Sequence, residues 1–306
     1  MIPGIVASQA MIARGGGGDG PSYGLLRIQA ADVTGVGNTP TYVEIEFLDE
    51  DGVDLATGGT AAASSVYSSS YVAAYAFDNN PATAWSQQTS LKRQWIQYSF
   101  PEPVPCTAVS LWNLSGSDIF HDFLVLGSND GGTTFDIVGW VFSATQNPPQ
   151  RRVFDLQMPD LSDPDIGSPH RYWRVTFIGS DDYIDLAEIY LLHGSDDQTT
   201  IHGGSASASS QYSSGYAAAN AFDRNTSSRW STAYNQSGQK WLAWDFGSGN
   251  AQIVDGIRYK NGGGRASYQA RDLLIEYSDD GSNWNLAHAE LGMAAWSSNE
   301  DRTYPF

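Results

Sequence analysis

The strongest constraint on the fold is an internal repeat. Residues 58–65, two glycines followed by small side chains, return as residues 203–210. The segment from Asp78 to Trp85 returns at one constant offset as the segment from Asp223 to Trp230. A chain of 306 residues has room for two domains of ordinary size, so the repeat predicts two copies of one domain.

The segments that follow in each copy are typical of β-strands. Residues 94–100 match residues 240–246, and in both segments alternate residues are apolar, as in a strand with one buried face. Residues 122–131 match residues 272–281, and both end in an Asp-Gly turn. Short strands between turns, without longer helical periodicity, predict an all-β fold of two sandwiches.

The two copies differ in how they end. The first closes with two strand-like segments within residues 171–190, whereas the second stops at Phe306 without them. Residues 23–48, ahead of both copies, contain a pair of the same form. We therefore expect a first sandwich over 57–194 and a permuted second sandwich over 203–306 plus 23–48. The hairpin would come from the same chain or, alternatively, from a neighbouring subunit by strand donation.

Residues 1–22 do not fit either sandwich. They combine a small apolar patch with Gly15–Gly18, too little to form a core, and predict a flexible arm that anchors the chain to a partner. No basic residue precedes Arg14, so no signal peptide is expected. No apolar stretch approaches the length of a membrane span, so no membrane insertion is expected.

The amino-acid composition narrows the classes of function that the chain can have. Lys and Arg total 16 against 34 Asp and Glu, a formal net charge of −18, which disfavours nucleic acid as a partner. The single cysteine, Cys106, excludes an intrachain disulfide and is expected to be a small buried hydrophobe. No nucleophile is paired with a base, and we expect no enzyme activity.

Four short motifs, which follow one another in a fixed order, resemble those of a known domain family. Residues 76–85, 94–97, 128–131 and 186–189 together resemble the discoidin, or coagulation-factor C-type, domain. This resemblance implies a galactose-binding-like jelly-roll sandwich, a fold that includes bacterial carbohydrate-binding modules. The cysteines that animal members usually carry near each end are missing, so phosphatidylserine binding is not implied. The opening residues and Gly15–Gly18 also resemble the start of some bacteriophage structural and tail-associated proteins.

In this family, the loop after Ala-Phe-Asp folds round a structural calcium ion together with a glutamate of the last strand. Carried over, the first site would comprise Tyr75, Asp78, Asn80, Thr83, Ala187 and Glu188. The second site would comprise Asn220, Asp223, Asn225 and Ser228, with Val43 and Glu44 from the hairpin. Such an all-oxygen set suits a hard cation. The alternative is that Asp78 and Asp223 only cap a turn.

Ligand binding is expected at the loops of one end of each sandwich, where an aromatic face can stack on a sugar. The candidates are Gln87, Gln88, Lys92, Tyr234, Asn235, Arg265 and Tyr268, whereas Trp85, Trp95, Trp230 and Trp241 recur and are expected in the core. We expect a virion-associated phage protein, made in the host cytoplasm, that is part of an oligomeric assembly. It would bind other virion proteins through its arm and host surface glycan through its sandwiches. The alternatives are a purely structural virion component and a bacterial carbohydrate-binding accessory protein.

Overall fold

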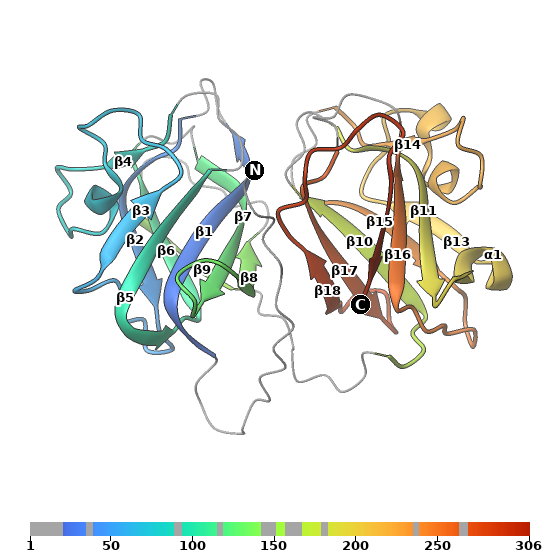
Figure 1. The fold of residues 1–306 in the computed structure, drawn as a ribbon, viewed down its shortest axis with the longest axis horizontal. Helices are drawn as coiled ribbons and strands as arrows, with labels where there is room; N and C mark the ends of the chain where they lie inside the picture. Colours follow the sequence, from blue (N-terminus) through green and yellow to red (C-terminus); the bar gives the residue numbers. More distant parts are fainter. Residues whose placement is uncertain are drawn as a thin grey trace. The chain divides into compact units, whose positions relative to one another are not determined.

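The computed structural model contains two β-sandwiches (Figure 1), which confirms the all-β prediction. The structure describes residues 21–34, 39–88, 94–114, 119–141, 151–156, 167–178, 183–234, 239–262 and 269–306. The chain divides into two compact units, which we call the N-terminal sandwich (described residues 21–156) and the C-terminal sandwich (described residues 167–306). Within these ranges no helix is long and apolar enough to cross a membrane.

The N-terminal sandwich is built from two antiparallel sheets. The larger has the strand order β3 (Thr60–Ala63), β5 (Trp95–Pro105), β1 (Ser22–Thr34), β7 (Ile119–Ser128), β8 (Asp136–Val141). The smaller has the order β4 (Trp85–Ser86), β2 (Thr41–Leu48), β6 (Ala108–Asn113), β9 (Arg151–Asp155). The expected hairpin is therefore wrong: β1 and β2 do not pair with each other but lie inside different sheets, away from the edges.

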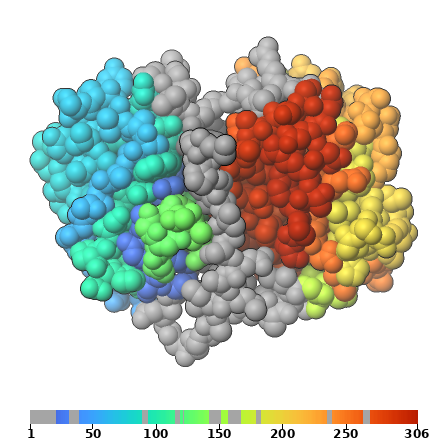
Figure 2. Space-filling model, in the orientation of Figure 1, coloured from blue at the N-terminus to red at the C-terminus, as the bar shows by residue number. Residues whose placement is uncertain are grey.

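The C-terminal sandwich repeats this plan. Its first sheet has the order β13 (Ser205–Ala208), β15 (Lys240–Asp245), β10 (Tyr172–Ile178), β17 (Asp272–Ser278), β18 (Asn285–Glu290). Its second has the order β12 (Asp196–Asp197), β11 (Asp185–His193), β16 (Gly256–Asn261), β19 (Asp301–Pro305), and β14 (Trp230–Ser231) also pairs with β11. The short helix α1 (Gln198–His202) follows β12. The C-terminal segment, which includes the edge strand β19, forms a continuous area of surface in Figure 2 (red).

The predicted permutation is wrong. Strand β1 pairs with β5 and β7, and β2 pairs with β4 and β6, so residues 23–48 complete the first copy of the repeat. Strands β10 and β11 pair with β15, β17, β14 and β16, so residues 171–193 belong to the second copy and not to a sandwich over 57–194. Strands that are neighbours in sequence are usually neighbours within one domain. Here β1 and β2 begin the first copy, and β10 and β11 begin the second. The predicted arm 1–22 lies outside the described residues except at its end, where Ser22 already begins β1.

Each sandwich encloses one apolar core. Trp85 and Trp230 are fully buried in the two cores, and their indole nitrogens donate to the carbonyls of Ser65 and Ser210 at 3.1 and 2.9 Å. The core prediction is confirmed for this pair. It is wrong for Trp95 and Trp241, which are only half-buried because strand alternation turns them away from the core.

The burial of Cys106 is confirmed. Its side chain is 2% exposed, and burial raises the pKa of the thiol to about 12. The thiolate, which is the reactive form, is therefore suppressed at neutral pH.

The strand pairing predicts that β2 stabilises the N-terminal sandwich and that β11 stabilises the C-terminal sandwich. Ile45 on β2 and Ile189 on β11 hold equivalent buried positions, and Ile→Ala in a core costs about 2–5 kcal/mol of unfolding free energy. We expect Ile45→Ala to speed amide hydrogen exchange in β5 and β7 of the full chain but not in β15 and β17. Ile189→Ala is the matched control and should show the reverse. Faster exchange in β15 and β17 of the Ile45→Ala protein would contradict this strand order and support the permuted arrangement.

Candidate functional site

Two loops, one in each sandwich, hold the residues predicted to bind calcium. The loops follow the 3₁₀ turns η1 (Ala73–Ala76) and η3 (Ala218–Ala221) and lead into β4 and β14. Both take a left-handed conformation at the residue after the aspartate, with φ of 55° at Asn79 and 62° at Arg224. The repeat therefore preserves the backbone of the loop even where the side chain differs.

Asp78 and Asp223 organise these loops. One Asp78 carboxylate oxygen accepts from the backbone N–H of Asn80 at 3.0 Å and the other from the Thr83 hydroxyl at 2.8 Å. In the C-terminal loop, Asp223 accepts from the N–H of Asn225 at 2.8 Å and from the Ser228 hydroxyl at 2.7 Å. These are the contacts expected if Asp78 and Asp223 cap a turn, which is the alternative to calcium binding. They hold the aspartates in place without using all of their lone pairs.

A buried glutamate faces each loop from a β-bulge. The register of β2 shifts between Tyr42 and Glu44, and that of β11 shifts between Leu186 and Glu188, which leaves Val43 and Ala187 as the extra residues. A bulge re-aims the neighbouring side chain and leaves one residue out of the ladder. Glu44 and Glu188 are 7% and 0% exposed.

The pairing of glutamate and loop differs from the prediction. Glu44 accepts a hydrogen bond from the backbone of Asn79 and lies near Asp78, whereas Glu188 lies near Asp223. The correction follows from the strand order, because β2 and β11 each stay in their own copy. The candidate sets are thus Tyr75, Asp78, Asn80 and Thr83 with Val43 and Glu44, and Asn220, Asp223, Asn225 and Ser228 with Ala187 and Glu188.

The residues of both loops fit a calcium ion. The Oε1 atoms of Glu44 and Glu188 are buried and have no hydrogen-bond partner, a costly state that a cation would relieve. Burial, and then the neighbouring aspartate, raises the pKa of Glu44 to about 7. Burial also raises the pKa of Glu188 to about 7, although Arg224 opposes the shift. No group of three or more His, Cys, Asp or Glu side chains suited to a metal occurs among the described residues, so amide, hydroxyl and carbonyl oxygens would complete either set.

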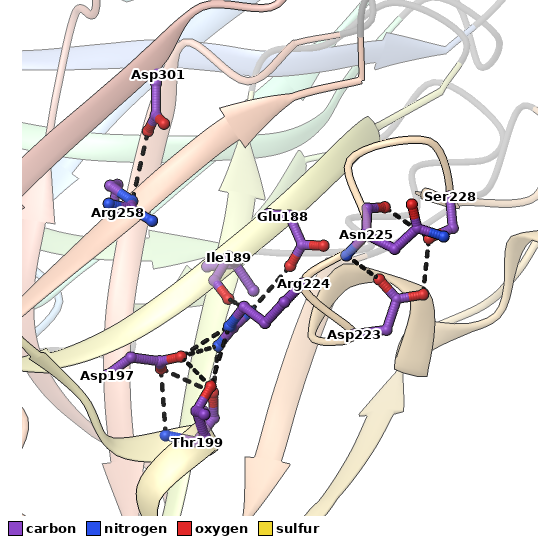
Figure 3. A network of polar contacts seen from close by, with 11 residues as sticks. Glu188, Ile189, Asp197, Thr199, Asp223, Arg224, Asn225, Ser228, Arg258 and Asp301 are labelled. Atoms are coloured by element: carbon purple, nitrogen blue, oxygen red, sulfur yellow. Dashed lines mark hydrogen bonds and ion pairs between the residues drawn. The ribbon is translucent and has the colours of Figure 1, made fainter.

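Arg224 distinguishes the C-terminal loop (Figure 3). Its Nη1 donates to Oε2 of Glu188 at 2.8 Å and to the Ile189 carbonyl at 3.1 Å. Its Nε donates to Oδ2 of Asp197 at 2.7 Å, and Nη2 donates to the Thr199 hydroxyl. The N-terminal sandwich has Asn79 at this position.

A tyrosine cluster lies beside the C-terminal loop. The ring of Tyr183 is 5.6 Å from that of Tyr212 and 5.2 Å from that of Tyr234, and Tyr212 contacts Tyr216 at 5.5 Å. Tyr212 and Tyr234 are 54% and 58% exposed. This cluster, Tyr183, Tyr212, Tyr216 and Tyr234, presents aromatic surface of the kind that binds a ligand.

Two charged side chains adjoin the tyrosine cluster. Nη1 of Arg229 lies 3.5 Å from Oδ2 of Asp185, and the guanidinium lies over the ring of Tyr216. Oδ1 of Asp185 is buried and has no partner, and burial raises the pKa of this carboxyl although Arg229 opposes the shift. Asn220 links the cluster to the calcium loop, because its amide nitrogen donates to the carbonyls of Gly215 and Arg229 at 2.9 and 3.1 Å.

The N-terminal sandwich has half of this cluster. Tyr67 and Tyr71 hold the positions of Tyr212 and Tyr216, with ring centres 6.0 Å apart, and Tyr67 is 57% exposed. Thr39 stands where the C-terminal sandwich has Tyr183, since Thr41 and Asp185 pair with the equivalent residues of β4 and β14.

The predicted ligand residues are only partly placed. Tyr234 lies in the tyrosine cluster and Gln88 is exposed, whereas Gln87 is fully buried. The remaining four, Lys92, Asn235, Arg265 and Tyr268, lie outside the described residues. The sequence prediction missed Tyr183, Tyr212, Asp185 and Arg229. Recurrence of a tyrosine pair as 67/71 and 212/216 was the available signal for Tyr212.

Comparison with known proteins agrees with this architecture. The family model described as F5/8 type C domain matches residues 60–158 and again residues 205–305. No curated protein and no solved structure matches the chain. The two matched regions cover more than half of the sequence, and they begin at the equivalent strands β3 and β13. The chain belongs to the F5/8 type C, or discoidin, domain family and contains two copies of that domain.

Proposed function

We propose that this protein is a non-enzymatic binding protein that recognises glycan through the tyrosine cluster of its C-terminal sandwich. F5/8 type C domains are in general non-catalytic modules that bind carbohydrates and other ligands, which supports the class of function. The observation that carries the choice of site is the exposed tyrosine cluster beside the Asp185–Arg229 pair. Its incomplete counterpart in the other sandwich makes the C-terminal module the main binding module.

The chemistry of this site suits a sugar. The apolar face of a pyranose ring stacks on aromatic side chains, while a few polar groups fix its hydroxyls. Tyr212 and Tyr234 supply the exposed rings. Arg229 supplies N–H donors at the edge of the cluster, and the buried carboxylate of Asp185 holds its guanidinium in place. The net charge of −18 argues against a polyanionic ligand.

The scaffold holds this site in place. Tyr212 donates its backbone N–H to the Ser231 carbonyl at 2.8 Å, and Ser231 pairs with Asp185 in the β11–β14 ladder. The cluster is therefore fixed to strand backbone on both sides. Sites on rigid elements lose less conformational entropy when they bind.

Calcium is the proposed structural cofactor of the two loops. The support is the buried, unpartnered Oε1 of Glu44 and Glu188 opposite an aspartate loop. A bound ion would neutralise the carboxylates and pin the loop that leads into β4 or β14. It would supply no chemistry beyond that.

Substitution of the exposed tyrosines tests the binding site. On a glycan array the full chain should bind selectively, and Tyr212→Ala or Tyr234→Ala should weaken binding to the selected sugar at least tenfold. Loss of one stacking ring costs about 1.5–3 kcal/mol, estimated from the burial of one large apolar side chain. Tyr67→Ala is the matched control, because Tyr67 is equally exposed at the equivalent position of the other sandwich. Equal loss from all three substitutions would contradict the choice of sandwich, and no binding to any glycan would favour the purely structural role.

Calcium removal tests the cofactor. For a site saturated at 100 times its Kd, calcium adds about 2.7 kcal/mol to the unfolding free energy. We expect the melting temperature of the chelator-treated chain to rise by several degrees on addition of CaCl₂, and Asp78→Asn to remove most of this rise. Asp49→Asn is the control, since Asp49 caps another exposed turn of the same sandwich. A melting temperature that does not change when calcium is added would refute the proposal that calcium is a structural cofactor.

The setting in a phage virion stays a prediction. It depends on the arm 1–22, which lies outside the described residues except at its end. Binding of the purified chain to phage particles, lost on deletion of residues 1–20, would support it.

A further inference from the structure

The two calcium loops differ in the charge that surrounds the buried glutamate. Next to Glu44, the charged side chains that influence it are Asp78, Asp54 and Glu46, all acidic. Arg151 is paired with Glu46, at 2.5 Å, and not with Glu44. Next to Glu188, the influential groups are Asp223 and the cationic Arg224. One loop thus presents concentrated negative charge, and the other already contains a positive charge.

Arg224 is held firmly in the position from which it neutralises Glu188. Its guanidinium is shared between Glu188 and Asp197, at 2.8 and 2.5 Å, and lies over the ring of Tyr190 at 4.1 Å. Tyr190 takes the place that Glu46 has in the N-terminal sandwich, so an acidic neighbour is replaced by a cation-binding ring. Arg258 lies over the same ring at 3.7 Å and adds a second cation next to it.

Arg224 also ties the loop to the segment that leads into β13. Asp197, its second partner, caps helix α1 by accepting from the N–H of Thr199 at 3.2 Å. One side chain thereby connects the bulged strand β11, helix α1 and the loop (Figure 3). A structural cation in the loop would supply the same kind of cross-link.

We propose that Arg224 is a built-in substitute for much of the cation's role, so that the C-terminal loop binds divalent cations far more weakly than the N-terminal loop. A guanidinium on the same carboxylate removes one negative charge from the site and repels an incoming ion. Oε1 of Glu188 still has no hydrogen-bond partner, and Glu188 still lies near Asp223, which is why binding is weakened rather than abolished. The inference rests on the proposed calcium sites and makes the N-terminal sandwich depend on calcium much more than the glycan-binding sandwich does.

Hydrogen exchange of the full chain during a CaCl₂ titration measures both loops in one sample. Peptides over residues 75–86 should become protected at a calcium concentration at least tenfold lower than peptides over residues 220–231. Arg224→Asn, which recreates the N-terminal sequence at a left-handed position that Asn tolerates, should lower the calcium requirement of the C-terminal loop at least tenfold. Arg224→Lys keeps the charge and should leave that requirement high.

Asn79→Arg is the reciprocal variant and does not depend on the C-terminal sandwich remaining folded. It should raise the calcium requirement of the N-terminal loop at least tenfold. Equal requirements of the two wild-type loops, unchanged by either exchange, would overturn the inference and leave calcium binding intact. No protection of either loop at millimolar calcium would overturn the calcium sites together with the inference.

Discussion

The structure of each sandwich depends on one central strand, β1 or β10, that is hydrogen-bonded on both sides. β1 lies between β5 and β7, and β10 lies between β15 and β17. Without it, the larger sheet would split into two parts with open edges, which are costly and prone to aggregation. The chain continues from the central strand into β2 or β11 of the other sheet, so the bulged glutamate stays in the same sandwich as the central strand. Packing of the core and position of the candidate site therefore have one origin.

The repeat made the strands predictable, but it did not show where one copy ends and the next begins. A periodic sequence can be divided at any point of its period, and both divisions give the same alternation of apolar residues. The choice depends on which connections stay within a domain, and short connections between neighbouring strands are the rule. Residues 49–59 link β2 to β3 within one sandwich, so β2 never leaves its copy. The incorrect division carried Glu44 and Glu188 into each other's candidate site, although each loop receives one buried glutamate in either division.

The features that the sequence did not reveal depend on contacts between distant segments. Tyr183 meets Tyr212 and Tyr234 only because β11 pairs with β14, and no local pattern announces that meeting. Arg224 was visible as the counterpart of Asn79, yet its reach to Asp197 depends on the fold of the segment after β11. Trp95 illustrates the converse. It recurs in the repeat and was predicted to be core, but it lies under the guanidinium of Arg27 on the outer side of its strand.

The differences between the two copies are physically connected. A buried carboxylate is tolerated only if positive charge or a proton compensates it, and Glu44 and Glu188 are both buried but have different neighbours. In the C-terminal sandwich the compensating charge is part of the chain, and Asn220 joins that loop to Arg229 beside the tyrosine cluster. Under the proposed roles, the glycan site would be supported by groups of the chain itself and would depend little on the supply of an ion. In the N-terminal sandwich, where the tyrosine cluster is incomplete, the proposal leaves the same loop to an external cation. The proposed difference between the copies thus depends on the exchange of Asn79 for Arg224 and on the presence of Tyr183 and Tyr234 in the C-terminal sandwich.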